Sequence, residues 1–301
     1  MLRVCGPVSH SERGTGVAPL RRDTHTVLAP GAAEDSGIPA ELGSHLLPVR
    51  PTKDDGIIAS FLTAMPESVD SVAVGDLAAV TVAERSYDCR QFWIRFANTE
   101  DRRGKAALLV ARMYAKRGYN HAEVLRETWN TITLISHGPD GNVIGTVTIG
   151  MDSPDQGLLA DGGYRDQLDQ LRARGKRICE FTGFAIDPSV RSRLALARLF
   201  HIAVLYPWGM FGYTDCVIEV TPTHAGFYER LLRFERLGKA RICPRVNTVG
   251  VLLHGDFSFV MERLEKVGGL MGKAVGDRSL YPYGFSKADA DGILGRLKRM
   301  A

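Results

Sequence analysis

The chain has 301 residues, of which 45% are hydrophobic and 24% charged, a composition typical of a globular protein that can bury a full-sized core. No apolar run approaches the roughly 18 residues of a membrane span, and the N-terminal residues lack the apolar segment of a secretory signal, so a cytoplasmic protein without a transmembrane segment is expected. Five scattered cysteines without CxxC spacing indicate neither a disulfide framework nor a zinc site.

The net charge of +4 is unevenly distributed along the chain. Residues 172–198 and residues 230–245 each carry a net charge of +5, and the rest of the chain carries −6. A basic surface formed by these two windows would attract an acidic protein or a phosphate group rather than a long nucleic acid. The alternative is that the arginines lie on solvated helix faces.

Composition divides the chain into four parts. Residues 1–55 are rich in Gly, Pro, Ser and Ala without periodicity, which predicts a flexible N-terminal extension. Residues 56–88 hold an apolar run and a β-prone run, and this segment is expected to pack on a core domain at 89–260. Residues 261–301 form a C-terminal tail.

Regular patterns begin after Cys89. RQFWIRFA alternates as a strand does, and Thr99 with two acidic residues behind it predicts the start of an amphipathic helix that closes near Gly118. TWNTITLI and NVIGTVTIG form a predicted hairpin around Asp140-Gly141. A loop and a short helix ending at Gly175 follow.

The next segments predict a strand, a helix and a second strand. In RICEFTGFAI, strict alternation places Glu180, Thr182 and Phe184 on one face and Cys179, Phe181 and Ala185 on the other. A helical apolar stripe and the short strand CVIEV come next, and a crossover of this length makes the two strands parallel. A helix at 224–233 and two late strands follow. This order of elements predicts an α/β fold with a mixed sheet.

The sequence lacks GxGxxG, GxxxxGK[ST], GxSxG and HExxH motifs. CVIEVTPTHAGFYERLLRF resembles the last strand–helix unit of the GCN5-related N-acyltransferases. With ICEFTGFAIDPSVR, CPRVNTVGVLLHGDF and SLYPYGFSKADADGILGRL, residues 90–297 resemble the FeeM-like N-acyl amino acid synthases, which are related to the acyl-homoserine-lactone (autoinducer) synthases. The resemblance implies the N-acyltransferase fold, with two central parallel strands that splay apart.

The same resemblance implies an acyltransferase that moves a long-chain fatty acyl group from an acyl carrier protein thioester to the α-amine of an amino acid, giving a lipophilic lipoamino acid. The donor would be acyl-phosphopantetheine on the carrier protein, with no permanently bound cofactor and no metal. Two alternatives stay open. One is an acyl- or acetyl-CoA-dependent N-acyltransferase, and the other is a non-catalytic module that binds acyl chains or the carrier protein.

The resemblance also implies catalytic residues. Glu180 matches the glutamate of the E-x-S-R-F segment of the lactone synthases, whose arginine is replaced here by Gly183. Glu180 would take the proton of the attacking ammonium, or would form an ion pair with Arg177 or another arginine. Tyr228 would protonate the leaving thiolate, or would pack in the core. Backbone N–H groups of Phe184 and Ala185 would stabilise the oxyanion.

The resemblance also implies residues that bind the donor and the acceptor. The phosphate-binding turn of the superfamily corresponds to VRSRLALA, which has no glycine, and there Arg191, Ser192 and Arg193 would hold the phosphate of a pantetheine arm or contact the carrier protein. Tyr114 and Tyr119 match aromatic residues of the acceptor pocket of the lactone synthases or pack at the helix end.

The remaining positions of interest are two departures from the lactone synthases and several polar residues of open role. Val110 and Gly183 stand where the lactone synthases have arginine, which argues against lactone synthesis. In the loop 151–163, three aspartates would bind an amine or face water: Asp152, Asp155 and Asp161. Cys243 is a weak candidate for an acyl-carrying nucleophile, and His201 and His224 are expected to be structural.

Overall fold

The computed structural model describes residues 56–66, 87–116, 128–138, 140–190, 192–271, 273–274 and 276–301. All of them belong to one unit, His45–Ala301, and the expected N-terminal extension 1–55 lies outside the described residues. The strands are β1 (Ile57–Pro66), β2 (Tyr87–Phe96), β3 (Thr131–His137), β4 (Val143–Met151), β5 (Ile178–Ile186), β6 (Asp215–Val220), β7 (Glu235–Cys243) and β8 (Thr248–Asp256). The helices are α1 (Glu100–Ala115), α2 (Asp161–Ala173), α3 (Arg193–Phe211), α4 (Pro222–Leu231), α5 (Phe257–Val267), the 3-10 turn η2 (Tyr281–Tyr283) and α6 (Lys287–Met300).

The described strands form one eight-stranded sheet in the order β1-β2-β3-β4-β5-β6-β8-β7. Every pair of neighbours is antiparallel except β5 and β6, which are parallel and are joined through α3. The mixed α/β sheet and its parallel central pair are therefore confirmed. Strand β1 extends the sheet by pairing with β2, whereas the sequence predicted only that this segment packs on the core.

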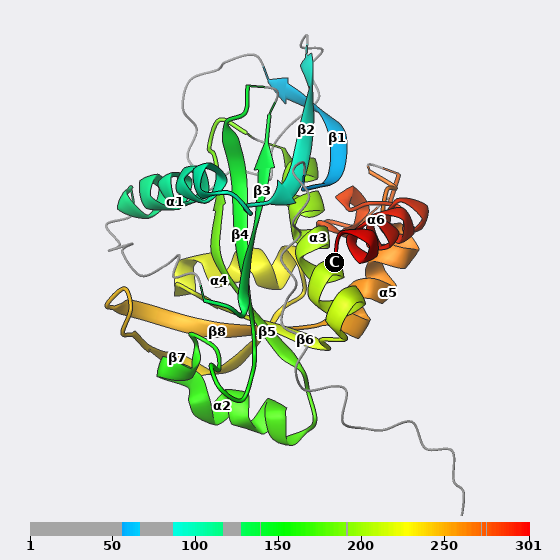
Figure 1. Cartoon of the computed structure of the whole chain (residues 1–301). Helices are drawn as coiled ribbons and strands as arrows, with labels where there is room; N and C mark the ends of the chain where they lie inside the picture. Colours follow the sequence, from blue (N-terminus) through cyan, green and yellow to red (C-terminus); the bar gives the residue numbers. More distant parts are fainter. Residues whose placement is uncertain are drawn as a thin grey trace, which may run out of the picture. The chain divides into compact units, whose positions relative to one another are not determined.

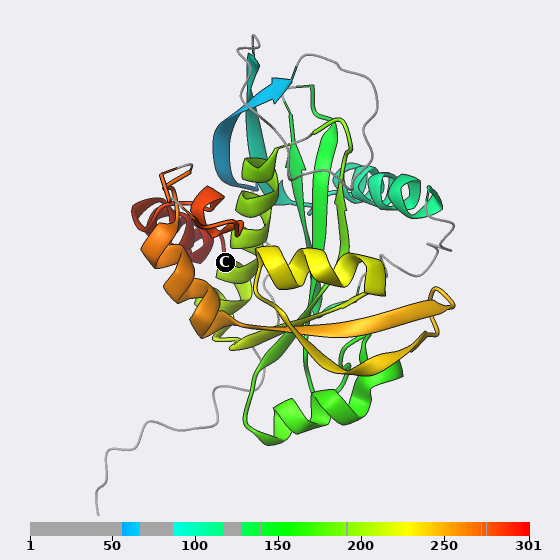
Figure 2. The same cartoon turned by 180° about the vertical axis from the view of Figure 1, so that it is seen from behind.

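The helices cover both faces of the sheet. Helices α1 and α2 lie on one face, and α3, α4, α5 and α6 lie on the other (Figures 1 and 2). Helix α3 is long and apolar enough to cross a membrane by length and composition alone. It is nevertheless mostly buried against the sheet and the C-terminal helices, because its apolar residues surround the helix on nearly every side.

The parallel strands β5 and β6 pair over three residues only. The pairs are Ile178 with Asp215, Cys179 with Cys216, and Glu180 with Val217. Beyond Glu180, β5 stays with β4, while β6 follows β8 as far as the pair Val220–Val251. Figure 1 shows β8 running across the direction of β4, as the separation of the two halves of the sheet requires. The splayed central strands expected for the N-acyltransferase fold are present.

A β-bulge lies on β5 directly after the point of separation. Thr148 of β4 pairs with Thr182, but Thr146 pairs with Ala185, so Gly183 and Phe184 together face Val147. Gly183 has φ +56°, a left-handed conformation that favours glycine.

The bulge reverses the faces that strict alternation predicted for the next two residues. Phe184 lies 6.4 Å from Tyr228, centroid to centroid, on the face covered by α4, and Ala185 packs in a cluster with residues of α1. The prediction that Phe184 shares a face with Glu180, and Ala185 with Phe181, is therefore wrong, because one extra residue inverts the side-chain order of a strand.

Candidate active site

Glu180 is the last residue of β5 that pairs with β6, and its side chain is 1% exposed. Its Oε2 accepts a hydrogen bond of 3.1 Å from the Ala160 N–H, and its Oε1 is buried without a hydrogen-bond partner among the described residues. Burial raises the pKa of Glu180 to about 7, although Arg245 and the Ala160 N–H favour the charged form. A carboxyl group that ionises near neutral pH therefore stands where the two strands separate.

The tip of the β7–β8 hairpin, residues 244–247, approaches Glu180 from the other half of the sheet. Arg245 donates a 2.6 Å hydrogen bond to Glu219 of β6, and its Nη2 lies 3.9 Å from Oε1 of Glu180. Val246 of the same tip packs in the α1 cluster that contains Ala185. The sequence predicted neither Glu219 nor Arg245 as a site residue, although both lie in segments that carry the family resemblance.

Cys243 belongs to the same polar group. Its Sγ donates to Oε2 of Glu219 at 3.2 Å, and burial, together with Glu219, raises the pKa of the thiol. Because the thiolate is the reactive form, this environment disfavours Cys243 as an acyl-carrying nucleophile. The ion pair predicted for Glu180 with Arg177 or another arginine forms with Arg245 at 3.9 Å, whereas Arg177 lies over the ring of Tyr213.

Tyr228 lies on the opposite face of the sheet, buried on α4. Its ring meets Phe184 nearly edge-on, at an interplanar angle of 67°, and also packs against Phe227 and Phe234. Tyr228 is therefore a core residue that also contacts the bulge. The structure brings together Tyr228 and Phe184 on this face, and Glu180, Glu219 and Arg245 on the other.

The predicted phosphate-binding turn precedes α3. Arg191 lies outside the described residues. Ser192 caps the helix, because its hydroxyl accepts a 3.1 Å hydrogen bond from the Ala195 N–H. Arg193 donates to the carbonyl of Arg278 at 2.9 Å and lies over the ring of Tyr283. The Arg193 side chain thus contacts the C-terminal segment of the protein.

Of the two aromatic residues assigned to an acceptor pocket, Tyr119 lies outside the described residues. Tyr114 is partly buried at the α1 cluster, beside Ala185 and Val246. Val110 is buried in this cluster, so the position occupied by arginine in the lactone synthases serves apolar packing here. Tyr114 therefore lies on the same face as Glu180, close to the bulge and the hairpin tip.

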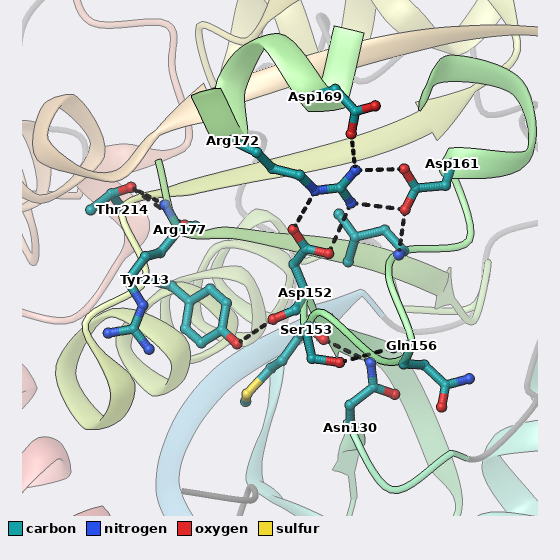
Figure 3. Close-up of polar contacts among 12 residues, drawn as sticks. Asn130, Asp152, Ser153, Gln156, Asp161, Asp169, Arg172, Arg177, Tyr213 and Thr214 are labelled. Atoms are coloured by element: carbon teal, nitrogen blue, oxygen red, sulfur yellow. Dashed lines mark hydrogen bonds and ion pairs between the residues drawn. The ribbon is translucent and has the colours of Figure 1, made fainter. Parts of the chain in front are cut away.

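The loop before α2 is held by one arginine, as Figure 3 shows. Arg172 forms ion pairs of 2.7 Å each with Asp152, Asp161 and Asp169, and the side chains of Arg172, Asp152 and Asp161 are largely buried. Asp161 also accepts a 2.7 Å hydrogen bond from the Leu158 N–H, and hydrogen bonds to Arg172 and this N–H hold its pKa below the usual value despite partial burial.

This network decides the role of the predicted amine-binding aspartates. Asp152 and Asp161 are both bound to Arg172, and Asp155 is exposed. The prediction that Asp152 or Asp161 binds a substrate amine or simply faces water is thus wrong. Their ion pairs instead fix the loop that presents the Ala160 N–H to Glu180.

Replacing Arg172 by methionine is expected to lower the free energy of unfolding by about 3 kcal/mol, the size typical of removing one partner of a buried ion pair. The loss arises because Asp152 and Asp161 keep their charges without a counterion. Denaturant unfolding of the parent and the variant measures it. Arg174→Met is the matched control, because Arg174 is exposed and lies only two residues further along the chain, at the end of α2. This variant should unfold like the parent. An Arg172→Met protein as stable as the parent would contradict this account.

Many arginines of the two basic windows are bound within the protein. Those with ion pairs or hydrogen bonds to protein groups are Arg172, Arg193, Arg236, Arg241 and Arg245. Much of the charge in both windows is therefore used in contacts of the fold, and the expected basic docking surface remains a prediction.

The histidines considered from the sequence have structural contacts. Buried His201 accepts a 3.0 Å hydrogen bond from the Phe285 N–H, and burial lowers its pKa to about 3. His224 lies 2.7 Å from the Thr221 hydroxyl. In the part of the chain that the structure describes, no group of three or more His, Cys, Asp or Glu side chains is placed to hold a metal ion.

Comparisons with known proteins agree with this geometry. The family model "N-acyl amino acid synthase FeeM" matches residues 105–256, just over half of the chain. The solved structure of FeeM, an N-acyl amino acid synthase from uncultured soil microbes, is 25% identical in sequence and covers 56% of this chain and 92% of its own, with a TM-score of 0.50. A comparison with curated proteins found no match.

Two more distant structures were also found. An acyl-CoA N-acyltransferase from Pseudomonas aeruginosa is 11% identical and covers 55% of this chain and 98% of its own, with a TM-score of 0.39. The AHL synthase LasI is 15% identical and covers 55% and 90%, with a TM-score of 0.40. The chain belongs to the FeeM family of N-acyl amino acid synthases, and it is an N-acyltransferase with the GCN5-related fold.

Proposed function

We propose that this N-acyltransferase moves a long-chain fatty acyl group from the thioester of an acyl carrier protein to the α-amine of an amino acid. The observation that carries the proposal is the separation of β5 from β6 directly beyond Glu180, a buried carboxyl group with a pKa of about 7. The similar protein FeeM is an N-acyl amino acid synthase, which supports the same class of acceptor.

In the proposed reaction Glu180 is the general base. The acceptor amine arrives as an ammonium, which cannot attack until it loses a proton, and the Glu180 carboxylate takes that proton. The neutral nitrogen then forms a bond to the thioester carbon, and the carbonyl oxygen becomes an oxyanion. Backbone N–H groups of the bulge, at Phe184 and Ala185, stabilise that charge. The tetrahedral intermediate then collapses, the acyl–sulfur bond breaks, the sulfur leaves as a thiolate, and the nitrogen loses its second proton to solvent to give the amide.

Tyr228 is proposed to donate a proton to the departing thiolate. It contacts Phe184 on the face opposite Glu180, so a thioester between the two strands would present its carbon to the amine on one side and its sulfur to the phenol on the other. A thiol is already a good leaving group, so the contribution of this proton is small.

The donor is proposed to lie along the free edge of β5. After Glu180 this edge is no longer paired with β6, so its backbone groups can hydrogen-bond the amides of a pantetheine arm as an added strand does. The turn before α3 has no glycine to bring backbone N–H groups close to a pyrophosphate. This favours the single phosphate of a carrier-protein arm over CoA, and the residues proposed to hold that phosphate are Arg191, Ser192 and Arg193.

Product analysis tests the proposal. Purified protein is incubated with carrier-protein thioesters or CoA thioesters of matched chain length and a mixture of amino acids, and acyl amides are identified by mass spectrometry. Amides formed faster from the carrier-protein donor are the expected result. Amides from CoA alone would favour the CoA-dependent alternative, and acyl binding without any amide would favour a non-catalytic binding module.

A further inference from the structure

Arg245 lies beside the proposed base but has no part in the chemistry described so far. It stands in the four-residue tip between the last residue of β7 and the first of β8. The tip is fixed on both sides, because Val246 packs in the α1 cluster and the guanidinium of Arg245 bonds to Glu219. Arg245 is therefore held rigidly on the face of the sheet that the acceptor amine would approach.

The guanidinium has hydrogen-bonding capacity that the protein does not use. Arginine carries five N–H donors, and among the described residues Arg245 makes one hydrogen bond, to Oε2 of Glu219. Its side chain is only 19% exposed. N–H donors of a largely buried guanidinium that lack a hydrogen-bond partner lower the stability of the protein, unless a ligand or a water molecule accepts their hydrogen bonds.

An unused acceptor lies next to these donors. Oε1 of Glu180 is buried without a hydrogen-bond partner, and at 3.9 Å from Nη2 of Arg245 it is too far for a hydrogen bond to it. Arg245 lies 2.6 Å from Glu219 and 3.9 Å from Glu180, so two carboxylates share one guanidinium and a negative charge is left over for a cation. The site thus offers a carboxylate to an ammonium and a guanidinium edge to an anion, side by side.

A zwitterionic α-amino acid fits both, because its ammonium and its carboxylate are attached to the same carbon. We propose that Arg245 binds the α-carboxylate of the acceptor and so orients its α-amine toward Glu180. The planar guanidinium suits a carboxylate because it forms two parallel charge-assisted hydrogen bonds. This inference rests on the proposed function and adds the group that selects a free amino acid over an amine without a carboxylate.

The test compares a free amino acid with its carboxamide, which keeps the side chain and the amine but lacks the negative charge. For Arg245→Gln, kcat/KM for the amino acid is expected to fall roughly 10- to 100-fold, as for a lost charge-assisted hydrogen bond. The value for the carboxamide should change little. The amine of a carboxamide is also less basic, so the decisive quantity is the change in the ratio of the two values between parent and variant.

Control variants separate recognition from stability. Arg236→Gln removes an exposed arginine of β7, the strand that leads to the tip, and should leave the ratio unchanged. Arg245→Lys keeps the charge without the planar fork and should give an intermediate ratio, and it replaces Arg245→Gln if that variant does not fold. An unchanged ratio in a folded Arg245 variant would overturn the inference, since a purely structural role would affect both acceptors equally.

Failure of the proposed function is recognised separately. It would show as a parent protein that forms no amide with any acceptor. Calorimetric titration of the amino acid and of its carboxamide into parent and Arg245→Gln would then decide the role of Arg245 without turnover. Tighter binding of the amino acid that disappears in the variant supports the inference, and equal binding of both compounds to the parent refutes it.

Discussion

Replacement of Glu180 by glutamine is expected to lower kcat by about 10²- to 10⁴-fold, the range typical of a lost general base. Glutamine keeps the size of the side chain and can still accept the Ala160 hydrogen bond, but it cannot take a proton from the acceptor ammonium. The variant should therefore fold as the parent does and still bind the acyl donor.

The pH dependence gives this prediction a second measurement. Burial raises the pKa of Glu180 to about 7, so the carboxylate is protonated below that pH and can act as a base only above it. The rate of the parent should therefore rise with pH through about 7, and this rise should be absent in Glu180→Gln. Steady-state rates with acyl donor in excess, from about pH 5.5 to about pH 9, test it.

Two variants serve as comparisons. Glu229→Gln changes a partly buried glutamate of α4 that pairs with Arg236 and should keep both rate and pH profile. Tyr228→Phe should keep the rise near pH 7 with a smaller loss of rate, because the thiol leaves readily. A Glu180→Gln enzyme that retains the parent rate and the same rise would remove Glu180 from the role of base.

Local patterns in the sequence predicted most of the fold. Alternation, helical stripes and turn residues predicted the core strands and helices in their observed order, because these signals depend on neighbours within a few residues. The three-residue pairing of β5 and β6 has no such local signal, since it depends on β4 and β8 drawing the two strands apart. Only the family resemblance indicated it.

The face of Phe184 shows where the local rule failed. The sequence places Phe184 at an even spacing from Glu180, and strict alternation assigns them to one face. Gly183 was the available signal, because an isolated glycine within a strand often marks a bulge. Because of the bulge, Phe184 lies on the same face of the sheet as Tyr228, and Ala185 lies on the same face as Glu180.

Charged residues of the site were the hardest to assign from sequence. Arg245 appeared as one member of a basic window and Glu219 as one residue of a buried strand. Strand β6 carries Glu219, and only the β7–β8 hairpin brings Arg245 to Glu219 and Glu180. Asp152 and Asp161 appeared free, yet both are bound to an arginine of α2. Long charged side chains bind partners from elements that are distant in the sequence, and the spacing of hydrophobic residues does not indicate such contacts.

Gly183 is the residue at which the fold and the proposed chemistry meet. Its φ of +56° is reached readily by glycine, tolerated by asparagine and strongly disfavoured for β-branched residues. Gly183→Val is expected to remove the bulge or distort it, and so to redirect the N–H groups of Phe184 and Ala185. Loss of one oxyanion donor lowers kcat about 10²- to 10³-fold, and a comparable loss is expected here.

Gly183→Asn is the matched comparison, because asparagine adds a side chain of similar size but accepts the left-handed conformation. It should keep kcat within about tenfold of the parent, since the backbone that supplies the oxyanion donors stays in place. Thermal unfolding of both variants shows whether each folds. Equal losses of kcat in two folded variants would mean that the side chain obstructs the donor, and that the bulge itself does not stabilise the oxyanion.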